Sequence, residues 1–107
     1  MSDCWASGSA PFASGGTVSV EVDLSCDTIV DSLQVSVTLT ESVGGKVVTV
    51  ASNWCSDSST SGFSCIASTA PCQHGSLYGQ TVDAVETNAV GDTTEDGWND
   101  NPQWVAC

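Results

Sequence analysis

Hydrophobic and polar residues alternate along several stretches of the chain, most regularly over residues 17–26. Successive side chains of a β-strand point to opposite faces, so an alternation of period two indicates a half-buried strand. The apolar positions of this stretch share one face: Val18, Val20, Val22, Leu24 and Cys26. We therefore predict a strand here, followed by a short turn over residues 27–31.

Similar patterns predict further strands. Residues 33–40 alternate in the same way, and the Gly44-Gly45 pair that follows is typical of a hairpin turn. Residues 47–54 are therefore expected to pair with residues 33–40 as an antiparallel neighbour. A short strand within residues 63–70, a longer one over 76–89 and a final one over 103–107 complete the prediction.

These elements predict an all-β fold, because no stretch of ten or more residues has a helical period. Strands at this spacing, separated by turn signals, indicate a sandwich with immunoglobulin-like or related Greek-key topology. The length suits a single domain over residues 1–107. Within it, the glycine- and serine-rich residues 1–16 are expected to form an irregular lead-in or an edge strand, and residues 90–103 an acidic loop.

Six cysteines change this picture. An even number in a short chain indicates three disulfides and an oxidising compartment, so we expect a secreted, extracellular protein held together by three bridges. Six cysteines allow fifteen pairings, and the sequence alone does not choose among them. The pairing that we favour joins Cys4 to Cys26, Cys55 to Cys65 and Cys72 to Cys107. A zinc site is disfavoured because the chain contains no Cys-x-x-Cys motif.

The charge of the chain excludes some partners. Thirteen acidic residues face a single Lys and no Arg, which gives a net charge of −12. Such a chain cannot neutralise nucleic-acid phosphates, and it is repelled by anionic membrane surfaces. No apolar run approaches the roughly 20 residues that span a bilayer, and the chain shows no signal-peptide segment. We therefore expect a mature secreted domain with no membrane insertion.

Candidate catalytic groups are sparse, and we expect no enzymatic activity. His74 is the one side chain whose ordinary pKa suits a general base near neutral pH, and it lies in a predicted turn. No Gly-x-Ser-x-Gly motif accompanies it. A pair of carboxylates is what glycoside hydrolysis requires, but the glutamates are predicted to face outward in strands or loops: Glu21, Glu41, Glu86 and Glu95.

The acidic segment offers a candidate metal site. Asp92, Asp96 and Gly97 match three positions of a calcium-binding loop, whereas Gln103 replaces the glutamate expected at its end. We expect no cofactor. The alternative is an irregular Ca²⁺ site built from Asp92, Asp96 and Asp100.

Aromatic residues supply the candidate contacts. Trp54 and Trp104 lie at strand ends and are expected to pack in the core or at its rim. Trp98 in the acidic segment, Phe63 in a cysteine-bounded loop and Trp5 in the lead-in are the candidate binding residues, since exposed aromatic side chains commonly anchor protein or sugar contacts.

The order of these features resembles a known group of proteins. It begins with Cys4-Trp5, continues with the Gly-Gly-Thr-Val-Ser-Val segment that leads to Cys26, and ends with Trp-Val-Ala-Cys107. The whole is similar to the small secreted, disulfide-linked β-sandwich proteins of actinobacteria. The resemblance implies an extracellular role, in some cases as an adapter in secreted protein assemblies such as umbrella-shaped toxin particles.

These observations favour a non-enzymatic module that binds another secreted protein, as an adapter or an inhibitor-like component. The edge of the N-terminal segment and the segments that carry Trp98 and Phe63 are the expected contacts, with strand addition as one route. The alternative is a domain that binds a carbohydrate or small ligand, assisted by Ca²⁺, through Trp98 and the acidic segment.

Overall fold

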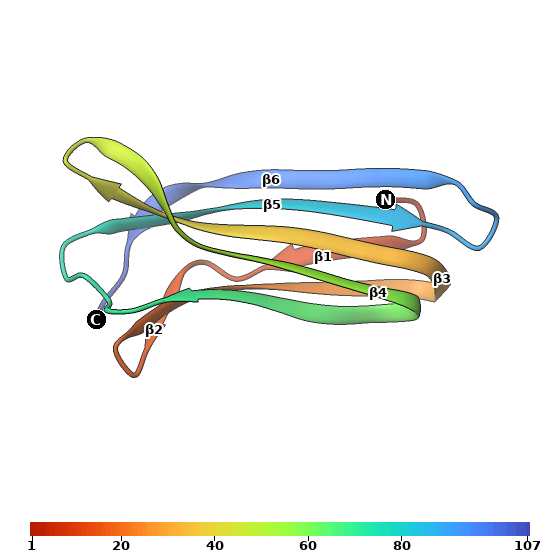
Figure 1. The fold of residues 1–107 in the computed structure, drawn as a ribbon, viewed down its shortest axis with the longest axis horizontal. Helices are drawn as coiled ribbons and strands as arrows, with labels where there is room; N and C mark the ends of the chain where they lie inside the picture. The colour runs from red at the N-terminus through yellow and green to blue at the C-terminus, as the bar shows by residue number, and fades with distance from the viewer.

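The computed structural model describes residues 1–107, except for the side chain of Asn101. The described chain is all-β and contains no helix (Figure 1). The six strands are β1 (Cys4–Gly8), β2 (Phe12–Ser14), β3 (Thr17–Val43), β4 (Lys46–Thr69), β5 (Leu77–Thr87) and β6 (Thr93–Trp104). The prediction of an all-β fold is confirmed, and no helix in this part of the chain is long and apolar enough to cross a membrane.

Strands β3 and β4 are much longer than ordinary strands and fold over on themselves. β3 has 27 residues and β4 has 24, against a usual range of roughly 3–10. The strands predicted over residues 17–26 and 33–40 are the two halves of β3, and the register with β4 is irregular between Ser25 and Val30. The predicted turn is therefore the place where β3 and β4 bend together, with a gap in their pairing between Ser25 and Val30, and return in a second layer (Figure 1).

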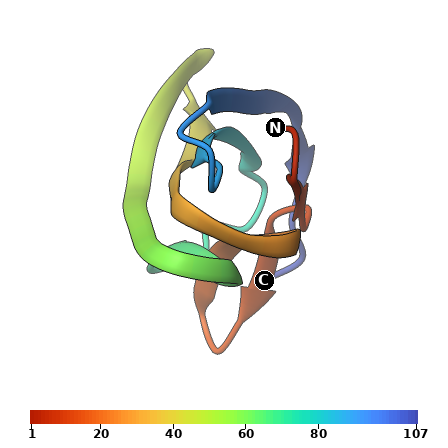
Figure 2. The ribbon, with the colours of Figure 1, turned by 90° about the vertical axis from the view of Figure 1, so that its right-hand side faces the viewer.

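The bend produces two facing layers from a single antiparallel sheet. The first layer contains β1, β2, the N-terminal half of β3 and the C-terminal half of β4. The second layer contains the other halves of β3 and β4 together with β5 and β6. Figure 2 shows this curled sheet from one end, with β4 on one side and β1 on the opposite side. An immunoglobulin-like Greek-key topology is not confirmed, because the strands form one continuous sheet.

Two predicted irregular segments are strands. Residues 1–16 contain β1 and β2, which pair with β3. Of the two expectations for this segment, an irregular lead-in or an edge strand, the structure has strands. The expected acidic loop over residues 90–103 is mostly β6, which pairs with β5 from Thr87↔Thr93 to Leu77↔Trp104. Its many polar residues suggested a loop, but a strand at a sheet edge tolerates them because its outward side chains stay in water.

The hydrophobic core lies between the layers and follows the predicted alternation. Both halves of β3 direct their apolar residues into it: Val18, Val20, Val22 and Leu24 from the first layer, and Leu33, Val35, Val37 and Leu39 from the second. Other strands add to the inner surface: Tyr78, Val82 and Ala84 from β5, and Cys65 and Ala67 from β4. Burial of this surface supplies the main favourable free energy of folding.

The three disulfides are the pairs favoured from the sequence. Cys4 and Cys26 lie opposite each other in the register of β1 and β3. Cys55 and Cys65 lie in the second and first layers respectively, so their bridge joins the two halves of β4 across the bend. Cys72 and Cys107 attach the C-terminus to the segment between β4 and β5.

The bend of β4 depends on a glycine. Thr60 Oγ1 accepts a hydrogen bond from the amide of Gly62 and donates one to its carbonyl oxygen, each at 3.1 Å. Gly62 has φ of 141°, and a Cβ placed on it would lie 2.2 Å from the carbonyl oxygen of Leu24. Any side chain at this position would therefore push β3 and β4 apart.

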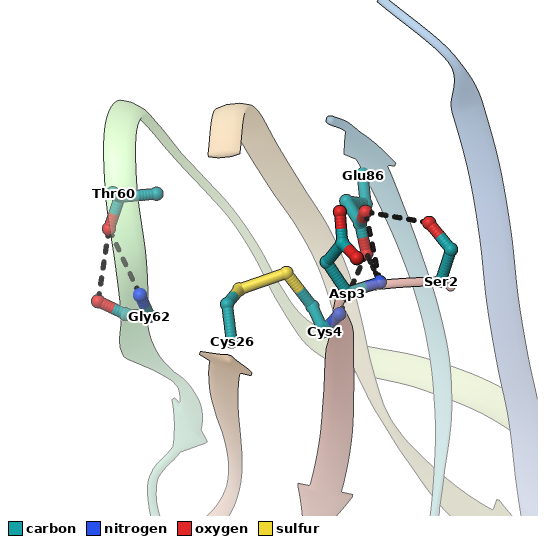
Figure 3. The surroundings of a disulfide bond; sticks show 7 residues. All are labelled: Ser2, Asp3, Cys4, Cys26, Thr60, Gly62 and Glu86. Atoms are coloured by element: carbon teal, nitrogen blue, oxygen red, sulfur yellow. Dashed lines mark hydrogen bonds between the residues drawn. A yellow bond between two sulfur atoms is a disulfide. The ribbon is translucent and has the colours of Figure 1, made fainter. Parts of the chain in front are cut away.

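Glu86 of β5 is fully buried, so its predicted outward orientation is wrong. Residues 78, 80, 82, 84 and 86 of β5 all face the interior, and this periodicity overrides the charge of the carboxylate. The carboxylate accepts hydrogen bonds from the amides of Asp3 (3.1 Å) and Cys4 (2.9 Å) and from the Ser2 hydroxyl (Figure 3). Backbone donors thus compensate the loss of water around this charge.

A second buried side chain of β5 acts at the other end of β1. Gln80 Nε2 donates to the carbonyl oxygen of Ser9 (2.6 Å) and to Asp100 Oδ2 (2.5 Å). Beside it, the Trp98 ring packs over Gly8, where a Cβ would lie 3.0 Å from Cζ2. In the described part of the chain β1 forms a backbone ladder with β3 alone, so Glu86 and Gln80 close the seam between β1 and β5 by side-chain hydrogen bonds.

Substitution Glu86→Ala is expected to lower the free energy of unfolding by about 2–4 kcal/mol, because the amides of Asp3 and Cys4 lose their acceptor. The melting temperature should fall by roughly 10–20 °C. Calorimetry with the disulfides intact measures both quantities. Glu21→Ala removes the same charge from the outer side of the first layer and should change stability by less than about 0.5 kcal/mol. Equal losses in the two variants would contradict the role of Glu86 in the seam.

Substitution Gly62→Ala is expected to cost more than about 2 kcal/mol, because the new Cβ clashes with the backbone of Leu24. Gly44→Ala is the matched control: Gly44 also has positive φ, but nothing lies within 4 Å of its added Cβ. The control should cost about 1 kcal/mol, from backbone strain alone. Urea unfolding curves measure the difference in stability between the two variants. Equal midpoints would contradict the prediction, because they would mean that the backbone accommodates a Cβ at Gly62 without loss of stability.

Candidate functional site

The outer face of the second layer is a broad polar surface built from four strands. The registers align its residues in rows across β4, β3, β5 and β6. Three of these rows are Ser56–Gln34–Val85–Glu95, Trp54–Ser36–Asp83–Gly97 and Ser52–Thr38–Thr81–Asn99. Hydroxyl, amide and carboxylate groups dominate them, because the alternation of each strand sends its apolar residues to the core.

A shallow hollow of about 420 Å³ lies on this face beside Trp54, whose side chain is 60% exposed. The remaining lining is polar: Ser32, Gln34, Ser56, Asp57 and Ser58. Gln34 and Ser32 of β3 lie directly opposite Ser56 and Ser58 of β4. The hollow forms because an indole stands next to small serine side chains that leave the space above the sheet empty.

The backbone that carries Trp54 is held from both sides. The adjacent Cys55 is bridged to Cys65, and Asn53 Nδ2 donates to the carbonyl oxygen of Ile66 at 2.9 Å. Asn53 Oδ1 in turn accepts from the amide of Trp54 at 2.9 Å. The disulfide and the hydrogen bond to Ile66 both join the segment that carries Trp54 to the C-terminal half of β4. The bend in β4 therefore helps to hold Trp54 in position beside the hollow.

Two carboxyl groups interact on the same face. Glu95 of β6 lies one row from Asp83 of β5. A hydrogen bond shared with Asp83 and repulsion from its charge raise the pKa of the Glu95 carboxyl. Glu95 is exposed to solvent, and Lys46 at the β3–β4 hairpin is the only Lys or Arg of the chain.

The far end of this layer is apolar. The β3–β4 hairpin projects beyond the rest of the body (Figure 1, upper left). The register aligns Val47, Ser42, Leu77 and Trp104 in one row, and Val43 and Val48 lie beside it in the hairpin. Four of these side chains form what we term the apolar end, each at least 40% exposed: Val43, Val47, Val48 and Trp104.

The aromatic residues are not distributed as the sequence suggested. Trp54 and Trp104 were expected to pack in the core or at its rim, but both are exposed, Trp104 to 69%. Trp98 and Phe63, two of the candidate binding residues, are half-buried against the core, whereas Trp5 is exposed as expected. The orientation of Trp54 had a detectable signal: the neighbouring Cys55 faces inward to its disulfide, so Trp54 must face outward.

The candidate calcium ligands are not brought together. Asp92 is exposed at the turn before β6, Asp96 accepts the amide of Gly97 at 2.9 Å, and Asp100 accepts from Gln80. Asp96 and Asp100 are separated along one extended strand by roughly 13 Å. Among all side chains that the structure describes, no three His, Cys, Asp or Glu residues form a metal-binding group. His74 is exposed in the turn before β5.

Comparison with known proteins does not place the chain in a family. No model of a protein family matches the chain, and no curated protein is similar to it.

Substitution Glu95→Gln is expected to raise the melting temperature slightly at neutral pH, because it removes repulsion between two ionised carboxylates. A raised pKa means that the folded protein binds the Glu95 proton more tightly than the unfolded chain does. The stabilisation by this group is therefore present at acidic pH and is lost as pH rises through the raised pKa.

The gain from Glu95→Gln should accordingly disappear when the pH is lowered below the ordinary range of a glutamate, about 4. Thermal unfolding followed across pH tests this. Glu21→Gln makes the same change in net charge on the first layer and corrects for the general effect of charge. A gain that is independent of pH, or equal in both variants, would contradict the interaction with Asp83.

Proposed function

We propose that the protein is a non-enzymatic extracellular module that binds another secreted protein through the apolar end. The observation that carries this proposal is the exposure of Val43, Val47, Val48 and Trp104 together at one end of the second layer. Val47 and Trp104 lie in one register row, and Val43 and Val48 belong to the same hairpin. Large exposed apolar side chains gathered at one end of a molecule are typical of protein interaction sites. Tryptophan is also enriched among the residues that dominate binding free energy.

The shape of this end suits a protein partner better than a small ligand. The apolar side chains stand on a projecting hairpin and an adjacent strand end (Figure 1), and none of them lines the hollow beside Trp54. Apolar side chains on a projecting hairpin are buried by insertion into a complementary groove of a partner. Beyond the apolar end the strands carry polar side chains, which would form the rim of such an interface.

Two free strand edges extend from the same end. In the described residues β4 pairs with β3 alone and β6 with β5 alone, so the outer edges of both strands offer unpaired backbone groups. β4 begins at Lys46, next to Val47 of the apolar end, and β6 ends at Trp104. A partner seated there is positioned to add a strand to either edge. The N-terminal edge favoured from the sequence is less open, since Glu86 and Gln80 occupy its backbone groups.

The charge of the molecule specifies the chemistry of the partner. A net charge of −12 attracts a basic surface and repels an acidic one over several ångströms. The proposed partner therefore combines an apolar groove with a basic surround. Three disulfides and the resemblance to small secreted actinobacterial proteins support an extracellular setting and an adapter role.

The test is capture of secreted proteins by the tagged, oxidised protein from culture supernatant of its source organism, with mass spectrometry of what is retained. We expect one protein with a basic surface to be retained. The double variant Val47→Asp/Trp104→Ser should bind it at least about 30-fold more weakly, because two exposed anchors are lost. Affinity should also fall as salt is added.

The control variant is Trp54→Ser, which removes another exposed indole from the same layer and should leave this binding unchanged. Retention by the double variant at wild-type affinity would overturn the assignment to the apolar end. Failure to capture any protein under oxidising conditions would overturn the proposed function itself.

A further inference from the structure

The hollow beside Trp54 is chemically different from the apolar end. Its one apolar group is an exposed indole, and its other lining groups are hydroxyls, an amide and a carboxylate: Ser32, Gln34, Ser56, Asp57 and Ser58. Its volume of about 420 Å³ is within the range of roughly 300–1,000 Å³ that small-molecule sites occupy. A protein groove for a hydrophobic side chain would be lined by apolar groups, and this one is not.

We propose that this hollow binds a neutral oligosaccharide chain, with Trp54 as the stacking platform. One face of a pyranose ring presents only C–H groups, which pack on the face of an indole. The ring edge presents hydroxyls, each of which both donates and accepts hydrogen bonds. An exposed indole bordered by serine hydroxyls, the Gln34 amide and the Asp57 carboxylate offers both kinds of contact in one place.

The charges select neutral sugars. Asp57 is the only charged residue of the lining, and the only Lys or Arg of the chain lies at the β3–β4 hairpin. Uronic acids, sulfated sugars and phosphosugars would meet a carboxylate, no cation and a net charge of −12. Neutral hexoses and N-acetylated amino sugars meet no such repulsion, and the serine and Gln34 side chains offer donors and acceptors to their hydroxyls.

The geometry favours a chain over a single sugar. From Trp54 to Ser58 the strand β4 advances by roughly 13 Å, which is longer than one pyranose ring. Ser56 and Ser58 follow Trp54 on the same side of β4, with Gln34 and Ser32 opposite them on β3. The hollow is open, so a saccharide that stacks on Trp54 continues along the serine row without meeting a wall.

The site needs little rearrangement to bind. Gln34 and the three serines of the lining project from paired strands, and Trp54 is adjacent to the Cys55–Cys65 disulfide. Groups that are ordered before binding lose less conformational entropy on contact. This inference does not rest on the proposed protein-binding role, because the two surfaces share no residue.

The experiment is a titration of the oxidised protein with cellohexaose, chitohexaose and mannohexaose, followed by calorimetry and by tryptophan fluorescence. Hexagalacturonate, an anionic chain of the same length, is the probe for charge selection. We expect at least one neutral hexasaccharide to bind and hexagalacturonate not to bind. Trp54→Ala should weaken binding at least about tenfold, and Gln34→Ala by a smaller factor.

Trp104→Ala is the matched control, because it removes a still more exposed indole outside the hollow. It should leave the affinity for the hexasaccharide unchanged, and melting curves of all variants establish that they are folded. The proposal is overturned if none of the three neutral probes binds at millimolar concentration. It is also overturned if Trp54→Ala binds like the wild type, or if both tryptophan variants lose affinity equally.

Discussion

The fold depends on two buried polar side chains of β5, Glu86 and Gln80, which fasten β1 where no backbone ladder is available. β3 and β4 run from one layer into the other, so their bend joins the two layers along one side of the core. On the opposite side β1 approaches β5 and β6 without pairing to them. Glu86 binds the amides of Asp3 and Cys4, and Gln80 binds the carbonyl oxygen of Ser9, so both ends of β1 are held. A buried carboxylate without a cation is tolerable because amide donors replace the lost water.

This closure explains how an acidic chain with one Lys keeps a compact body. With one Lys and no Arg, the chain has few cations to pair with its thirteen carboxylates. Hydrogen bonds to backbone groups and three disulfides therefore join segments that are distant in sequence. The remaining carboxylates stay in water, where solvent screens their repulsion. Asp83 and Glu95 are the exception on the second layer, because neighbouring strands hold them close enough to share a proton and raise the pKa of Glu95.

The bend also determines which surfaces are presented for binding. Once the apolar sides of β3 face each other across the core, every polar side of the second layer is directed outward as one broad sheet face. Trp54 stands on that face beside small serines, which creates the hollow, and the hairpin extends past the core, which exposes the apolar end. The two surfaces differ in chemistry because one lies above a packed core and the other lies beyond it. These are the two surfaces for which we propose a protein partner and a neutral sugar chain.

The sequence by itself determined the strands with clean alternation, the residues that they bury and a number of cysteines that suits three bridges. It left fifteen pairings open, and the tertiary structure has the one that we favoured. Alternation is a local property, and Val18 to Leu24 and Leu33 to Leu39 display it without reference to any neighbour. Only the tertiary structure decided that residues 27–31 fold one strand over between layers and that residues 93–104 pair as β6. It also turned Glu86 and Trp98 inward and left Trp54 and Trp104 in solvent. These outcomes depend on which segments pack against each other, because a carboxylate is buried only where another segment brings it donors, and a tryptophan only where another segment covers it.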